Sequence, residues 1–126
     1  MTAPHFGTAI NCIDGRVQEP VRQWMRAEYH LDYVDMITLP GPDEALVRGL
    51  VEVVDQVRSA ARISVQLHRS SVVAIAGHHN CAGNPLPAAG HTAQIKQCAQ
   101  ITGSWHLPVL VVGLWVNERW QVEPVS

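Results

Sequence analysis

Two short stretches, residues 11–16 (NCIDGR) and residues 77–83 (GHHNCAG), decide how this chain is interpreted. Each follows a short apolar run that is typical of a β-strand, and together they contain Cys12, His78 and Cys81. Thiolate and imidazole are ligands that zinc prefers, and zinc is usually four-coordinate. Two cysteines and one histidine therefore predict a Zn²⁺ site that keeps one position for water or another side chain.

The length of 126 residues suits one domain with a buried core, and we expect a single domain over residues 1–126. The formal net charge is -2 and the nine Lys and Arg residues are dispersed, which argues against a nucleic-acid partner. No apolar run approaches the ~18 residues of a membrane span, and residues 1–8 lack the pattern of a signal peptide. We therefore expect a cytoplasmic protein with no membrane partner.

The cysteines support the same location. Cys12, Cys81 and Cys98 are odd in number and widely spaced, so they do not form a disulfide framework. This favours a reducing compartment, with thiols used as ligands or as core filler. Cys98 falls on the apolar face of a predicted helix, where we expect it to fill space. A redox dithiol is disfavoured because the chain has no Cys-x-x-Cys pair.

Short apolar runs alternate with helical patterns, which is typical of an α/β fold. We expect a single mostly parallel sheet flanked by helices, with four parallel strands and a C-terminal antiparallel strand. The last strand is expected to be antiparallel because only a tight turn separates it from its predecessor. The expected strands are residues 7–12, 33–39, 71–76, 108–116 and 120–125.

Helices are expected between these strands. The first is predicted to begin with Glu19 as its N-cap and Pro20 at the first helical position. The second is predicted to be capped by Asp43 and to carry apolar residues at helical spacing. Residues 60–68 alternate as in a strand, but the crossover to the next parallel strand requires a helix, which we therefore predict there. Thr92 is predicted to cap the last helix.

The candidate ligands should meet at one end of the sheet. In an open parallel sheet, ligands bind beyond the carboxyl ends of the strands. Cys12 ends the first predicted strand, whereas His78 and Cys81 follow the third. If these strands are neighbours, all three side chains lie at the same edge, and the short spacing from His78 to Cys81 lets one turn direct both at one ion.

The motifs at residues 12–16 (CxDxR) and 77–81 (GHxxC) resemble the zinc-site signature of the β-class carbonic anhydrases. The order of the predicted elements resembles that family from residue 7 to the end of the chain. The resemblance implies that Cys12, His78 and Cys81 hold zinc. It also implies a parallel sheet covered on both faces and an obligate homodimer or higher homo-oligomer.

The activity implied by the resemblance is that of a zinc lyase, the reversible hydration of carbon dioxide to bicarbonate. Zinc lowers the pKa of its bound water, so that hydroxide can attack carbon dioxide near neutral pH. Asp14 and Arg16 are the implied catalytic pair: Asp14 accepts a hydrogen bond from the water, and Arg16 holds Asp14 by a two-pronged ion pair. Two alternatives stay open, a COS or CS2 hydrolase that uses the same hydroxide, and a zinc-stabilised binding or regulatory module without turnover.

Some residues depart from the family pattern or lack a predicted role. Residues 39–42 (LPGP) stand where the family usually has Arg-Asn-Ala-Gly, and Asn80 stands where Asp is common. His79 is interpreted as a solvated loop residue or a polar neighbour of the ligands, and the sequence assigns no role to the other histidines. The tryptophans are expected in the core or in dimer contacts: Trp24, Trp105, Trp115 and Trp120.

Overall fold

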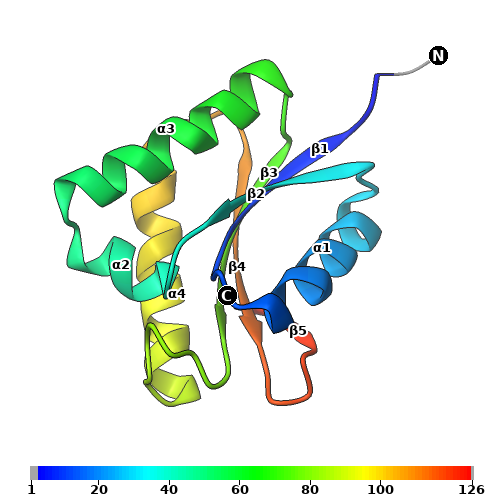
Figure 1. Ribbon diagram of the computed structural model, residues 1–126. Coiled ribbons are helices and arrows are strands. Elements are labelled where there is room, and N and C mark those ends of the chain that lie inside the picture. Colours follow the sequence, from blue (N-terminus) through cyan, green and yellow to red (C-terminus); the bar gives the residue numbers. More distant parts are fainter. Residues whose placement is uncertain (1–2, 126) are drawn as a thin grey trace.

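A five-stranded sheet organises the part of the chain that the computed structural model describes, residues 3–125 (Figure 1). The strand order is β2-β1-β3-β4-β5, with β1 parallel to β2 and β3, β3 parallel to β4, and β4 antiparallel to β5. This arrangement confirms the predicted fold class. The strands are β1 (Phe6–Asn11), β2 (Tyr33–Thr38), β3 (Val72–His78), β4 (Leu110–Val116) and β5 (Val122–Val125).

Helices cover both faces of the sheet. Figure 1 shows α1 (Gly15–Tyr29) on one face, and α2 (Pro42–Arg48), α3 (Val51–Leu67) and α4 (Ala88–Gly103) on the other. None of these helices, which lie within the described residues, is long and apolar enough to cross a membrane.

Each face of the sheet has its own apolar core. Every residue of β3 is buried, because this central strand is covered by helices on both sides. Under α1, the core includes Val17, Val21 and Met25, which recur every fourth residue along one helical face. On the opposite face, the core includes Leu46 of α2 and Cys98 of α4.

The first helix begins earlier than predicted. Its N-cap is Asp14 rather than Glu19, and the Asp14 carboxylate accepts a hydrogen bond from the backbone N–H of Arg16 at 2.9 Å. Pro20 therefore lies inside α1, where it removes only one helical hydrogen bond. The earlier start places both members of the predicted catalytic pair at the beginning of α1, next to the end of β1.

The predicted second helix is divided into two. Gly49, with φ 68°, ends α2. Helix α3 continues to Leu67 and has His68 as its C-cap, which confirms that residues 60–68 are helical rather than a strand. Asp43 is not the N-cap of α2, because Gly41 occupies that position with φ 52°. The side chain of Asp43 is buried instead, where it takes part in the site described below.

Two other boundaries differ from prediction. α4 begins at Ala88 after Pro87, so Thr92 lies inside the helix rather than at its start. Trp120 lies in the turn before β5 rather than in the strand itself.

Candidate metal centre

The centre lies at the carboxyl ends of β1 and β3. These strands are parallel neighbours, which meets the condition that the sequence left open, so their ends reach the same edge of the sheet. Cys12 directly follows β1, His78 is the last residue of β3, and Cys81 lies in the turn that follows. The structure thus brings the Cys12 side chain to those of His78 and Cys81, from two segments that are distant in the sequence.

The three candidate ligand atoms form a tight cluster. All lie within 4.8 Å of one another, and the two Sγ atoms of Cys12 and Cys81 are 3.9 Å apart. Two thiolates bound to one tetrahedral zinc at about 2.3 Å would lie about 3.8 Å apart. All three residues are buried, with no more than 4% of their surface exposed. The spacing and the soft donor set therefore fit zinc.

His78 is oriented for metal binding. Its Nδ1 donates a hydrogen bond to the backbone carbonyl of His79 at 2.7 Å, which leaves the lone pair of Nε2 free for an ion. This Nε2 atom is buried and has no hydrogen-bond partner among the described residues. Burial also lowers the pKa of His78, which favours the neutral form that binds metals. A bound cation would satisfy this otherwise unpaired atom.

The thiols also fit a cation. Burial, and then the neighbouring Cys12, raise the pKa of Cys81 to about 11. The backbone N–H groups of Gly83 and Asn84 act in the opposite direction, because they stabilise the thiolate. Two buried thiolates this close would repel each other unless a positive charge lay between them, and a metal ion deprotonates its thiol ligands.

The carboxylate of Asp14 lies beside the cluster but is bound to Arg16. Asp14 Oδ1 accepts from Arg16 Nε at 3.0 Å, and Asp14 Oδ2 accepts from Arg16 Nη2 at 2.7 Å. This two-pronged contact lowers the pKa of Asp14 to about 2. Asp14 Oδ2 lies 4.0 Å from Nε2 of His78. The carboxylate is therefore close to the candidate ligands, and Arg16 holds both of its oxygens.

A small pocket of about 230 Å³ adjoins these residues. Most of its wall is apolar or backbone, and Asp14 is its charged member. Cys12, one of the three candidate ligands, forms part of the wall of this pocket. Its lining residues are Cys12, Ile13, Asp14, Pro40, Ala82 and Gly83.

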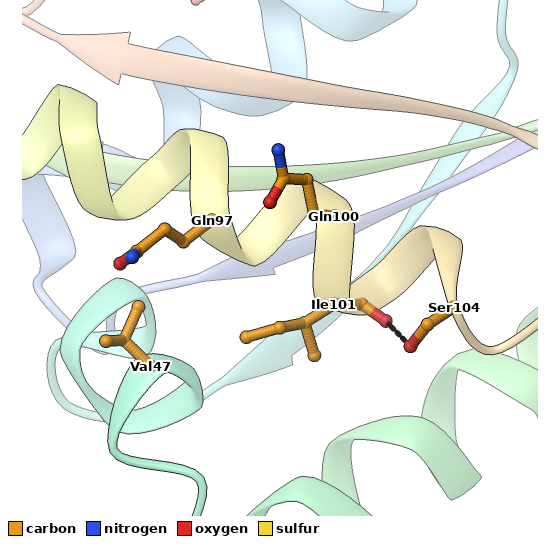
Figure 2. Close-up of a pocket in the computed structure, with 5 residues that line it drawn as sticks. All are labelled: Val47, Gln97, Gln100, Ile101 and Ser104. Carbon is orange, nitrogen blue, oxygen red and sulfur yellow. Dashed lines mark hydrogen bonds between the residues drawn. The ribbon is translucent and has the colours of Figure 1, made fainter.

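A different hollow, of about 390 Å³, lies between α2 and α4. Figure 2 shows Val47 of α2 opposite Gln97 and Ile101 of α4. The other lining residues of this hollow are Gln100 of α4 and Ser104, the C-cap of that helix. It shares no lining residue with the cluster, and it offers no cysteine, histidine or carboxylate. We therefore place the chemistry at the smaller pocket.

A buried polar network holds the loop that carries Cys81. His91 of α4 donates from Nε2 to the backbone carbonyl of Asn84 at 2.8 Å, and its Nδ1 lies 2.5 Å from Oδ2 of Asp43. His91 and Asp43 are fully buried. The pair also packs against β3, because a Cβ on Gly77 would lie 2.8 Å from Asp43 Oδ2. The network thus links α2, α4 and the loop after β3 that carries Cys81, Gly83 and Asn84.

The loop after β2 contacts the loop that carries Cys81 through backbone atoms. A Cβ on Gly41 would lie 2.8 Å from the carbonyl oxygen of Gly83, and a Cβ on Gly83 would lie 2.9 Å from the nitrogen of Gly41. Gly41 also has a left-handed φ of 52°. This close approach requires glycine on both sides. It gives a structural role to residues 39–42 (LPGP), which depart from the family pattern.

The sequence alone does not predict the roles of His91 and Asp43. Asp43 is one of the polar residues that follow β2 at the carboxyl edge of the sheet, and that position was the available indication. His91 had no indication, because its partners come from other elements. Cys98 lies apart from the cluster: its thiol is buried and donates to the carbonyl of Asp43 at 3.2 Å. Burial raises the pKa of Cys98 to about 12, which suits its predicted role as core filler.

We predict that the purified protein contains about one zinc per chain and that Cys81→Ser loses most of it, because a buried hydroxyl is a poorer zinc ligand than a thiolate. Elemental analysis after purification without chelator measures the zinc content. Cys98→Ser is the matched control, since it changes a buried thiol outside the cluster, and it should keep its zinc. Absence of zinc in the wild type, or equal loss in both variants, would contradict the assignment.

Comparisons with known proteins agree with this geometry. A family model described as "Putative carbonic anhydrase" matches residues 2–126. No curated protein shows significant sequence similarity to the chain.

Solved structures share the fold at low sequence identity. A carbonic anhydrase from Glaciozyma antarctica superposes with a TM-score of 0.62 and 13% identity, covering 98% of this chain and 83% of that one. A β-carbonic anhydrase from Trichomonas vaginalis gives a TM-score of 0.60 and 13% identity, covering 98% of this chain and 82% of that one. A carbonic anhydrase from Streptococcus mutans gives 0.55 and 14%, with coverage of 98% and 82%. The chain has the β-carbonic anhydrase fold and belongs to the carbonic anhydrase family whose model it matches.

Proposed function

We propose that this protein catalyses the reversible hydration of carbon dioxide to bicarbonate, with Zn²⁺ held by Cys12, His78 and Cys81. The observation that carries the proposal is the buried Nε2 of His78, which lacks a hydrogen-bond partner among the described residues and lies in a tight cluster with two thiols. Beside this cluster, both carboxylate oxygens of Asp14 accept hydrogen bonds from Arg16. The family and the fold support the same reaction.

The protein side chains have distinct roles in this proposal. When bound, zinc would supply a water molecule of lowered pKa as the source of the nucleophile. Asp14 holds no proton near neutral pH, because its pKa is lowered to about 2, so it can only accept a hydrogen bond from that water. Arg16 fixes the direction of the carboxylate.

The pocket suits a small neutral substrate. Its wall is formed largely by Ile13, Pro40, Ala82 and the backbone of Gly83, which favour an uncharged molecule such as carbon dioxide. COS and CS2 share this linear, apolar character, so they are the competing substrates of the test below.

The test measures zinc content, carbon dioxide hydration by stopped flow, and the hydrolysis of COS and of CS2 on one purified sample. We expect hydration well above the buffer rate in proportion to the bound zinc. Faster turnover of COS or CS2 than of carbon dioxide would favour the hydrolase alternative. A fully zinc-loaded protein without turnover of any of them would overturn the enzymatic proposal in favour of a binding or regulatory module.

We predict that Arg16→Ala lowers hydration by a factor of at least about 100 while zinc stays bound, since misplacing a group that directs proton transfer typically costs that much. Without Arg16, the nearby Asp14 carboxylate is free to occupy the open coordination position. The double variant Asp14→Ala with Arg16→Ala should recover part of the activity, because the position is open again.

Arg22→Ala is the matched control for this change. Arg22 also lies on α1 and pairs with an acidic residue, Glu19, at 2.7 Å, but it is not part of the cluster. It should retain wild-type hydration. Near-normal turnover in Arg16→Ala, or loss of its zinc, would contradict the role assigned to the pair.

We also propose that the protein is a homodimer or a multiple of one. β2 lies at the edge of the sheet, where its outer backbone groups can pair with another chain. Large exposed apolar side chains support an assembly that covers them: Ile13, Tyr33, Leu50, Val51, Ile63, Leu67, Leu86 and Leu110. Sedimentation velocity at micromolar concentration should give a dimer or larger species. A zinc-loaded, active monomer would exclude this assembly.

The cytoplasmic location is part of the proposal. Cys12 and Cys81 must stay reduced to bind zinc, although their sulfurs lie only 3.9 Å apart. A reducing compartment maintains such thiols, which supports the cytoplasm.

A further inference from the structure

Trp120 lies in the tight turn that joins β4 and β5. Its backbone N–H donates to the carbonyl of Asn117 at 2.9 Å, and the Asn117 N–H donates to the carbonyl of Gln121 at 3.0 Å. The side-chain oxygen of Asn117 accepts from the N–H groups of Arg119 and Gln121, at 2.9 and 3.1 Å. The backbone of the turn is therefore held by several hydrogen bonds.

The conformation of Trp120 is unfavourable for its residue type. Its φ is 58°, in the left-handed region that hairpin turns of this kind normally fill with glycine. A bulky side chain there is a genuine outlier, and such strain tends to occur at functional sites. Because glycine would form the same turn without strain, the indole ring is expected to have a role of its own.

The indole ring of Trp120 lies against the guanidinium of Arg16. The guanidinium carbon of Arg16 is 4.6 Å from the centroid of the Trp120 ring, a cation–π contact. The rings of His78 and His79 lie 6.1 and 6.5 Å from the same indole. Trp120 thus contacts both the candidate ligand and the residue that holds Asp14.

Arg16 needs an additional restraint. Its side chain is 49% exposed and that of Asp14 is 19% exposed, so water and salt screen their attraction. Hydrogen bonds to Asp14 use one edge of the guanidinium, and Nη2 also donates to the carbonyl of Asn80 at 3.3 Å. The guanidinium carbon also lies over the indole ring, which shields part of the group from water and restricts its rotation.

We propose that Trp120 is a positioning residue that holds the guanidinium of Arg16 in the orientation that occupies both oxygens of Asp14. The catalytic consequence rests on the proposed hydration of carbon dioxide, whereas the effect on Arg16 does not. The strained turn is the means by which the C-terminal hairpin brings an aromatic face to the start of α1.

The test uses the zinc-loaded full chain and three variants. Trp120→Gly removes the ring and adopts the turn freely, so it should fold. Trp120→Phe keeps a smaller aromatic face. Trp24→Leu is the matched control, because Trp24 packs against the same core cluster but meets Tyr29 edge to face, with ring centroids 5.9 Å apart, on the far part of α1.

Two quantities are measured, the NMR signal of the Arg16 Nε–H group and the rate of carbon dioxide hydration. In Trp120→Gly, the Arg16 signal should lose the ring-current shift from the indole and exchange faster with water. Hydration should fall about tenfold in kcat with little change in KM, as expected for loss of a partly desolvated cation–π contact. Trp120→Phe should lie between the wild type and Trp120→Gly, and Trp24→Leu should match the wild type in both measurements.

An unchanged Arg16 signal in Trp120→Gly, or an equal change in Trp24→Leu, would overturn the proposal. So would unchanged hydration in Trp120→Gly when the wild type is active. If the zinc-loaded wild type does not hydrate carbon dioxide, the proposed function fails, while the Arg16 signal still decides whether Trp120 holds this side chain.

Discussion

The parallel pairing of β1 with β3 is the constraint on which the site depends. It brings Cys12 and His78, which are remote in sequence, to the same edge of the sheet, and the turn after β3 adds Cys81. The strand that supplies His78 is buried along its whole length, so its end is fixed by packing on both faces. A cluster of candidate ligands built on such strands is more rigid than one built on loops alone.

The remaining parts of the site are loops that are held by specific contacts. The buried His91–Asp43 pair fixes the backbone after Cys81, and Gly41 and Gly83 bring two loops into backbone contact. Leaving one buried hydrogen-bonding group without its partner typically costs about 1–3 kcal/mol, because that group has given up its contacts with water. Buried hydrogen bonds therefore hold the loop that carries Cys81, while Cys81 itself packs in the apolar core under α1.

Most of the fold could be predicted from the sequence, because local patterns of apolar and turn-forming residues determine the order of strands and helices. Apolar runs ended by Gly and Pro located the strands, and the CxDxR and GHxxC motifs located the cluster. The predicted start of α1 was wrong. The hydrogen bond from the Arg16 N–H to the Asp14 carboxylate caps the helix earlier, and it outweighs the usual preference of proline, here Pro20, for the first helical position. Local patterns could not reveal the partners of His91 or the contact between Trp120 and Arg16. Both depend on elements that only the tertiary fold brings together.

The proposed activity requires zinc bound by two thiolates and one imidazole, and X-ray absorption at the zinc edge of the purified protein tests this most directly. It should show two sulfur neighbours at about 2.3 Å and one imidazole nitrogen at about 2.0–2.1 Å. A spectrum with fewer than two sulfur neighbours, or without imidazole, would contradict the centre formed by Cys12, His78 and Cys81.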